Sequence, residues 1–150
     1  IEYSPLTMKY LKKISKKINS NSGGILIIDY GYLNESMKNT IQSVSGHKFS
    51  NILNNFTQSD ITYNLNFKLI EKMIKKLNLK VAGITNQKNF LTNLGILKRA
   101  EIISNNLPFS KKADIYFRVK RLIDKNFMGD LFKVMFVAKK NIKFQTGFAN

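Results

Sequence analysis

The sequence predicts an α/β fold, because apolar runs typical of buried strands alternate with stretches of helical periodicity. The strongest strand pattern is Ile25-Leu26-Ile27-Ile28, entered through Gly23-Gly24 and left through Asp29-Tyr30-Gly31. A strand without polar alternation is typical of the interior of a parallel sheet covered on both faces. Two further strands are predicted at 79–84 and 131–138. The resulting order is α-β-loop-α-β-α-α-α-β, with few strands for a chain of 150 residues.

Residues favoured at helix ends locate the helices around these strands. Ser4-Pro5 begins the first helix, because Ser is a favoured N-cap and Pro suits the first helical position. Asn66 is predicted to cap the second helix, and either Thr85 or Asn86 the third. The predicted helices span residues 5–20, 67–77, 86–94, 96–104 and 111–124.

The longest predicted loop runs from Leu33 to Ser59, where Asn, Ser and Thr are frequent and no period is sustained. It contains His47 and leads into a short extended piece at 60–65. Loops of this length in compact domains are usually functional or mobile, because their backbone polar groups need solvent or side-chain partners. The chain is predicted to belong to a single domain, with no internal repeat and no linker.

The formal charge of +16 and the pI near 10.1 are reasons to consider a surface that binds phosphate backbones or anionic lipid. Nearly all the basic residues are Lys, and frequent Lys, Asn and Ile together are typical of an AT-rich coding bias. Pairs of Lys are distributed where solvated helix faces and ends are expected. We therefore expect a solvated basic surface rather than a nucleic-acid footprint.

Several classes of site are excluded or not expected. With no Cys, the chain cannot form disulfides, zinc–thiolate sites or a Cys nucleophile, and the single His47 cannot build a multi-His metal centre. No Gly-x-Gly-x-x-Gly, P-loop or Gly-x-Ser-x-Gly pattern occurs. Neither a membrane span nor a targeting segment is expected, because no long apolar run is present. Without an initiating Met, the chain is expected to start within a longer protein.

The best-placed candidate residues are Asp29, Tyr30 and Gly31, which follow the strongest strand. Ligands of open α/β sheets gather outside the carboxyl ends of the strands, so chemistry is expected at this end. Asp29 can hydrogen-bond a ligand or accept a proton, although a strand-end Asp that only caps a turn is equally common. Tyr30 can stack on a ligand or can simply pack.

Further candidates lie in the loop and at the start of the third helix. His47 is the only group with an ordinary pKa near neutrality, so it is a candidate base, although a structural or surface His is the commoner case. Asp60 and Thr62 form a polar pair that lines a cleft or serves turn chemistry. Gln87 either holds a substrate or caps a helix, and the cap is slightly favoured.

Together and in order, these points match a known pattern of motifs. The motifs are Glu2-x-Ser4-Pro5, Gly24-x-Leu26-x-Ile28-Asp29-Tyr30-Gly31, Thr40-x-x-x-Val44 with His47, Asp60-Ile61-Thr62-x-x-Leu65-x-Phe67, Thr85-x-Gln87-x-x-Phe90-Leu91-x-x-Leu94-Gly95-Ile96, and Met128-Gly129-Asp130-Leu131-Phe132-Lys133-Val134. The set covers nearly the whole chain and resembles the C-terminal part of the MidA family. These class I S-adenosyl-L-methionine-dependent methyltransferases include the mitochondrial complex I assembly factor with protein-arginine methyltransferase activity.

The resemblance implies the C-terminal half of a Rossmann-like, seven-stranded methyltransferase sheet. The strand that begins at Gly24 corresponds to the fifth strand and 79–84 to the sixth. The stretch 131–138 corresponds to the seventh, antiparallel and inserted between the other two. The family's Gly-rich cofactor loop falls before Ile1. S-adenosyl-L-methionine is therefore expected to bind the complete protein, and no cofactor is expected to bind this chain alone.

The resemblance also implies roles and partners. Methyl transfer depends mainly on positioning, and carboxylates are suited to hold a guanidinium. The expected catalytic residues are Asp29, Tyr30 and Asp60, and the expected substrate-binding residues are Gly31, His47, Thr62 and Gln87. The expected partners are the missing N-terminal half and a protein substrate, suspected to be a subunit of respiratory complex I. The implied compartment is the bacterial cytoplasm or the mitochondrial matrix.

The sequence departs from the family pattern at a few positions. Phe56-Thr57-Gln58 stands where Pro-Gly is usual, Asn66 where Asp is usual, and Asp130 where Glu is common. Two alternatives remain beside the methyltransferase. One is a basic nucleic-acid-binding module, motivated by the charge, and the other is a non-catalytic assembly or partner-binding remnant of a split methyltransferase gene.

Overall fold

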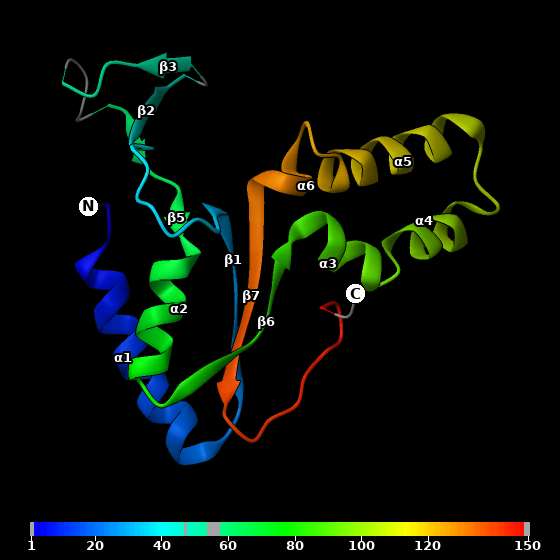
Figure 1. The fold of residues 1–150 in the computed structure, drawn as a ribbon. Coiled ribbons are helices and arrows are strands. Elements are labelled where there is room, and N and C mark those ends of the chain that lie inside the picture. The colour runs from blue at the N-terminus through cyan, green and yellow to red at the C-terminus, as the bar shows by residue number, and fades with distance from the viewer. Residues whose placement is uncertain (1, 47, 54–57, 149–150) are drawn as a thin grey trace.

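The computed structural model describes residues 2–46, 48–53 and 58–148, which form a mixed α/β fold of helices around a central sheet (Figure 1). The helices are α1 (Pro5–Asn21), α2 (Phe67–Lys76), α3 (Gln87–Asn93), α4 (Ile96–Ser104), α5 (Phe109–Ile123) and α6 (Met128–Leu131). The strands are β1 (Gly24–Tyr32), β2 (Gln42–Ser45), β3 (Lys48–Ser50), β4 (Asp60–Thr62), β5 (Leu65–Asn66), β6 (Leu79–Asn86) and β7 (Phe132–Lys139).

The main sheet has the strand order β5-β1-β7-β6. The last strand, β7, lies between β1 and β6 and is antiparallel to both, which confirms the expected insertion. It pairs with β1 from Gly24 opposite Ala138 to Tyr30 opposite Phe132. On its other side β1 has only β5, a parallel partner at Gly31 and Tyr32, so its edge before Gly31 has no partner strand among the described residues.

The two faces of β1 differ, which corrects the expectation of a strand covered on both sides. Ile25 and Ile27 pack against the core, whereas Leu26, Ile28 and Tyr30 are 47%, 48% and 44% exposed. Side chains alternate between faces along a strand, so the three exposed residues share one face, which we call the open face. An apolar run of this kind predicts burial on both faces, but over β1 the described chain covers only the face that carries Ile25 and Ile27.

The hydrophobic core lies between the other face of the sheet and the helices α1 and α2, which lie side by side in Figure 1. Its buried members come from two helices and two strands: Leu11, Ile18, Phe67, Ile70, Ile74, Leu79, Met135 and Val137. Each helix contributes one apolar stripe and exposes its Lys residues, as amphipathic helices on a sheet do. The core fixes the sheet and thereby the positions of the strand ends.

The predicted helix caps are confirmed at Ser4, Asn66 and Asn86. In each case the side-chain oxygen accepts a hydrogen bond from the backbone N–H three residues later, at 3.2, 3.1 and 2.8 Å. These bonds satisfy backbone donors that have no partner inside the helix. Asn66 therefore caps α2 with its amide oxygen at the position where the family pattern has Asp.

The prediction of an unbroken loop from Leu33 to Ser59 is wrong. Within it, β2 and β3 pair with each other, and β2 also pairs with β4, so that a three-stranded antiparallel sheet with the order β3-β2-β4 forms. Its interior is polar: Ser43 is buried, and its hydroxyl bonds that of Ser50 at 2.8 Å. The hydrophobic period that reveals most strands is therefore missing.

Two arms rise beyond the carboxyl ends of β1 and β6 (Figure 1). The small sheet forms one arm, and the hairpin of α4 and α5 forms the other. The chain after β7 runs back toward α3, where Phe144 packs on Phe136 and Phe148 on Phe90, with ring centroids 4.3 and 5.0 Å apart. The carboxyl end of β1 therefore lies between two projecting elements.

Candidate functional site

A row of polar side chains crosses the sheet at the carboxyl ends of β1 and β6. Lys133 of β7 is paired with Asp29 on one side and with Asn86 on the other. Directly opposite residues share a face, and their side chains are near neighbours. The row thus presents an anion, a cation and an amide at the edge where ligands of α/β sheets bind.

Lys133, the cation of this row, has a shifted pKa. Burial lowers the pKa of its ammonium group, while the nearby Asp130 carboxylate acts in the opposite direction. Its Nζ donates a hydrogen bond to the backbone carbonyl of Asp130, and Asn86 Nδ2 donates to Asp130 Oδ1 at 2.8 Å. Asp130 therefore joins the ends of β6 and β7, so that Lys133 and Asn86 belong to one polar network.

Asp29 faces the helices and lines a groove of about 320 Å³ between α1 and β1. Its Oδ1 accepts a hydrogen bond from the backbone N–H of Tyr30 at 2.8 Å, which is the turn-type contact weighed as an alternative. Tyr63 lines the same groove, and burial raises the pKa of its phenol, helped by the negative charges of Asp29 and Glu2. The carboxylate thus sits beside a phenol that stays protonated and is able to donate a hydrogen bond.

Tyr30 lies on the open face, opposite in direction to Asp29. Its ring packs on that of Phe132, with centroids 4.3 Å apart and a tilt of 38°. Successive residues of a strand point to opposite faces, so these two candidates do not converge on one groove within the described chain.

Gly31 and Gln87 have packing roles in the structure. A Cβ at Gly31 would lie 2.4 Å from the Leu65 carbonyl oxygen and 2.6 Å from Phe67 Cε2, so only glycine lets β5 and α2 approach β1. Gln87 is buried and donates from Nε2 to the Leu122 carbonyl at 2.8 Å, which ties α3 to α5. The N-cap of α3 is Asn86, so Gln87 does not cap that helix; its side chain instead bonds a carbonyl in the last turn of α5.

The remaining candidates belong to the small sheet or lie outside the described residues. Asp60 is exposed in β4 opposite Val44, and Thr62 Oγ1 accepts a hydrogen bond from Gln42 Nε2 at 3.2 Å. No described contact joins Asp60 or Thr62 to β1. His47 lies outside the described residues, as do the first two of the three residues that replace the family's Pro-Gly.

Sequence reasoning missed a connection made by Glu2, just before α1. The Glu2 carboxylate accepts hydrogen bonds from the Thr40 backbone N–H at 2.7 Å and from the Thr40 hydroxyl at 2.6 Å. The Thr40 hydroxyl in turn accepts from the Asn64 N–H at 2.9 Å, so one threonine joins α1 to both ends of the small sheet. Glu2 and Thr40 both belong to motifs that carry the family resemblance, and this membership was the feature of the sequence that could have indicated their contact.

The space beside Gly31, which follows the apolar run of β1, is filled by Leu65 and Phe67, so this glycine does not open a turn for a ligand's phosphate. No cluster of His, Asp or Glu with the geometry of a metal site occurs among the residues described. In the same part of the chain, no helix has the length and apolar character that crossing a bilayer requires.

Comparisons with known proteins agree on one family. The family model described as "Putative S-adenosyl-L-methionine-dependent methyltransferase" matches residues 1–85. Curated relatives include the mitochondrial protein arginine methyltransferase NDUFAF7 of Danio rerio, 27% identical over 82% of this chain and 29% of that protein. The Xenopus tropicalis protein of the same name is 26% identical over 94% of this chain and 33% of its own length.

Solved structures give the same fold. A Burkholderia thailandensis protein superposes on 99% of this chain and 41% of its own, with a TM-score of 0.84 and 20% identity. A second structure from that organism, bound to S-adenosyl-homocysteine, covers 95% of this chain and 38% of its own, with a TM-score of 0.76 and 22% identity. The chain spans about a third of the length of the curated relatives it matches, 29% and 33% in the two cases above.

Proposed function

This chain belongs to the S-adenosyl-L-methionine-dependent methyltransferase family whose model matches residues 1–85, and we propose that it is the C-terminal part of a protein arginine methyltransferase domain. The fold is that of the Rossmann-like methyltransferases to which it is similar. The proposal assigns the cofactor loop to a segment outside these 150 residues. It treats this chain as the half that carries the substrate side.

The observation that carries the proposal is the unpaired edge of β1 together with its exposed apolar face. Its edge from Gly24 to Tyr30 has no partner strand among the described residues, and the open face beside it exposes Leu26 and Ile28. Unpaired edges with apolar residues are normally covered in native proteins. Family relatives are about three times longer than this chain, which leaves ample sequence for the rest of the sheet.

The chemistry assigned to this chain is orientation of the methyl acceptor. S-adenosyl-L-methionine supplies an activated methyl group when it is bound in the complete protein. Asp29 and Asp60 are proposed to hold a guanidinium through charge-assisted hydrogen bonds, which are stronger and more directional than neutral ones. Tyr30 and Thr62 are proposed to complete the substrate side, Tyr30 from the open face and Thr62 from the arm that carries Asp60.

The assignment of the cofactor to other segments is tested by calorimetry. The 150-residue chain titrated with S-adenosyl-L-methionine should show no micromolar binding, since the proposal places the Gly-rich cofactor loop outside these residues. The product of the complete coding sequence, extended upstream, should bind. Micromolar binding by the short chain would show that the cofactor site is built from these residues, and the proposed division would then be wrong.

Arginine as the methyl acceptor is supported by the curated relatives, which are named mitochondrial protein arginine methyltransferases, whereas complex I as the source of the substrate rests on the sequence resemblance alone. We assign the complete protein to methylation of arginine in a respiratory complex I subunit, in the mitochondrial matrix or in the cytoplasm of a bacterium. Transfer of a labelled methyl group to complex I subunits, followed by mass spectrometry of the modified residue, tests this. Label on lysine or on a small molecule instead of arginine would contradict it.

The catalytic assignment is tested in the complete protein with Asp29→Asn and Asp60→Asn. Loss of a charged hydrogen-bond partner of the substrate should lower methyl transfer about 10- to 100-fold while cofactor affinity stays unchanged. Asp114→Asn is the matched control, because Asp114 pairs with Arg118 on the surface of α5 at 3.0 Å. Equal activity of all three variants would remove Asp29 and Asp60 from the mechanism.

A further inference from the structure

Helix α5 has an apolar outer side that nothing described covers. No residue of α5 is buried, although the helix is rich in apolar side chains. Phe109 and Phe117 are 86% and 65% exposed, and Phe127, just beyond the helix, is 50% exposed. Positions eight residues apart are separated by about 80° around a helix, so Phe109 and Phe117 lie on the same half of α5 and form a broad stripe. Exposed phenylalanines in such numbers are typical of an interaction surface.

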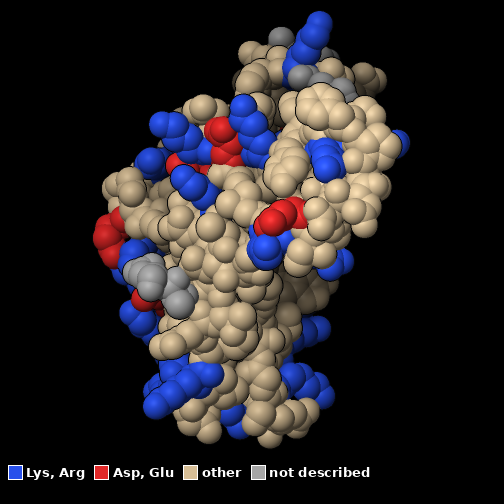
Figure 2. Space-filling model, turned by 90° about the vertical axis from the view of Figure 1, so that its right-hand side faces the viewer, with Lys and Arg blue, Asp and Glu red and all other residues tan. Residues whose placement is uncertain are grey.

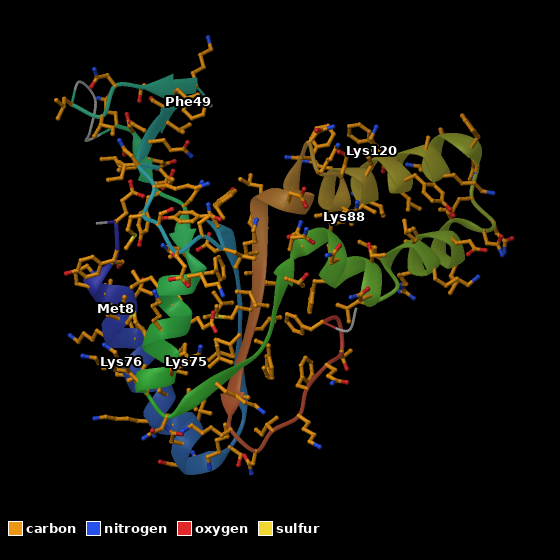
Figure 3. The ribbon with its side chains drawn as sticks, viewed as in Figure 1. Met8, Phe49, Lys75, Lys76, Lys88 and Lys120 are labelled. Atoms are coloured by element: carbon orange, nitrogen blue, oxygen red, sulfur yellow. The ribbon has the colours of Figure 1, made fainter. Side chains whose placement is uncertain are left out.

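Basic side chains border this stripe and form a groove with it. Lys120, Arg121, Phe117 and Phe127 line a cavity of about 380 Å³ at the end of α5. A second cavity of about 590 Å³, between α3, α4 and α5, shares Lys120 and adds the cations of Lys88 and Lys125. Lys88 and Lys120 are labelled in Figure 3. We call the two cavities together the α5 groove.

The cations of the α5 groove are not neutralised by the protein. The described ion pairs of this arm are Arg118 with Asp114 and Lys98 with Glu101, and both lie outside the groove lining. Among the described residues, no carboxylate lies within 4.0 Å of the groove's cationic nitrogens. Asp124 is the acidic residue of the lining, and its Oδ1 accepts from the Asn126 N–H at 2.8 Å. The groove therefore combines aromatic walls with an excess of positive charge.

We propose that the α5 groove docks an acidic segment of a partner protein that also carries apolar side chains. The phenylalanine walls bury the apolar side chains, and Lys88, Lys120 and Arg121 pair with carboxylates on the segment. Charge complementarity argues against a second copy of this chain, because two molecules of charge +16 repel each other. The proposal does not rest on the methyltransferase assignment, since it uses only surface features of one arm.

The basic side chains outside the α5 groove do not extend it into a larger binding surface. On the face shown in Figure 2, which lies on the side of the α4–α5 arm, blue side chains are spread among tan ones instead of forming one continuous band. A continuous band is the footprint expected for a nucleic-acid backbone. Because no such band is seen on this face, recognition of the acidic segment must come from the aromatic walls together with the cations of the α5 groove.

Fluorescence anisotropy with a labelled peptide of alternating Glu and Leu tests the proposal on the 150-residue chain at physiological salt. Lys120→Glu should weaken binding about tenfold or more. Lys76→Glu is the matched control, because it makes the same charge change and because Lys76 lies in the last turn of α2, just as Lys120 lies in the last turn of α5 (Figure 3). It should change affinity less than about twofold.

A second pair of variants tests the aromatic walls. Phe117→Ser should weaken binding of the Glu-Leu peptide about tenfold, whereas Phe49→Ser, which alters an 80% exposed ring of the small sheet, should have no effect. A peptide with Ser in place of Leu should bind more weakly than the Glu-Leu peptide. Thermal melts confirm that each variant is folded before its affinity is compared.

Three results would overturn the proposal. Equal losses in Lys120→Glu and Lys76→Glu would show attraction to net charge alone. Unchanged affinity of folded Phe117→Ser would remove the aromatic walls. Tighter binding of single-stranded DNA or of anionic vesicles than of the peptide, with the same dependence on Lys120, would assign the groove to nucleic acid or to membrane.

Discussion

Gly31 shows at the scale of one residue how packing rather than chemistry explains a motif glycine. A methyl group there would meet a backbone oxygen and a fully buried aromatic ring, Leu65 O and Phe67, and neither can move freely. Gly31→Ala should therefore lower the free energy of unfolding by about 1–3 kcal/mol, the usual cost of overpacking. Urea denaturation measures it, and an unchanged midpoint at the same slope would contradict the argument.

Asn66 offers a second test at this scale, because the family pattern has Asp at its position. Asn66 Oδ1 caps α2 through the Leu69 N–H, so Asn66→Ala should lower the free energy of unfolding by about 1 kcal/mol. Asn66→Asp keeps the acceptor and adds a charge favoured at a helix N-terminus, so its loss should be smaller. Equal urea midpoints of the two variants would rule out the cap as the reason for the residue.

Residue roles that depend on neighbours in sequence were predictable, and roles that depend on folding were not. The caps at Ser4 and Asn66 reach only three residues along the chain, so capping preference alone located them. The bonds from Glu2 to Thr40 and from Gln87 to Leu122 span distant segments, so spacing could not reveal them. Those contacts exist only once helices and strands have come together.

At the scale of elements, α1 and the small sheet are joined by the Glu2 carboxylate, and this junction should depend on pH. Hydrogen bonds from the Thr40 hydroxyl and N–H lower the pKa of Glu2 below its ordinary 4.5. A lowered carboxyl pKa means that the stabilisation is present above the unfolded-state value and is lost as pH falls through the folded-state value. The junction should therefore weaken only below pH 4.5.

The measurement for this junction is the amide chemical shift of Thr40 during an acid titration by NMR. The shift should move with a midpoint below 4.5, and Glu2→Gln should abolish that titration step. Glu101, whose carboxylate pairs with Lys98 on α4, is a suitable unrelated site for Glu→Gln as the control. A Thr40 midpoint unchanged by Glu2→Gln would assign the shift to another group.

Helices and strands with regularly spaced apolar residues were predicted well, and those without such spacing were not. The range of α4 was predicted in full, and α2 and β6 within two residues at each end, because apolar residues recur at helical or strand spacing there. The strands β2 and β3 were missed, since Ser43 and Ser50 make their interior contact with hydroxyls. The start of β7 was placed one residue early because Leu131 ends the short helix α6.

At the scale of the whole molecule, the open face and the unpaired edge of β1 have an effect on self-association opposite to that of the large net charge. Apolar surface favours association, while a charge of +16 keeps identical chains apart. Adding salt screens the repulsion but leaves the apolar surface unchanged. The isolated chain should therefore self-associate more as salt rises, the opposite of the behaviour expected for binding to phosphate backbones.

Sedimentation velocity across a salt series measures this association. Ile28→Lys places a charge on the open face, where Ile28 is half-exposed, and should keep the chain monomeric at salt concentrations at which the original associates. Lys substituted at Phe49, on the small sheet, is the control for added charge elsewhere. A chain that stays monomeric at all salt concentrations would show that the open face is not adhesive.

The overall sheet order was foreseen from the motifs and not from hydrophobic pattern. The apolar run at Ile25–Ile28 suggested a strand but no neighbours, because pairing partners lie far along the chain. The family resemblance supplied the order in which β7 separates β1 from β6, and the structure confirms it. Convergence of Asp29, Tyr30 and Asp60 stays a prediction, since within this chain they lie on different faces and different sheets.

The central place of β7 also has a consequence for synthesis on the ribosome. Residues 132–139 are made after both of the strands that they join, so β1 and β6 leave the ribosome without their common partner. At ordinary translation speeds, β1 waits on the order of ten seconds before β7 appears. During that time its apolar residues are available to chaperones, and an early stop codon before residue 132 would leave two strands that have nothing between them to hold them together.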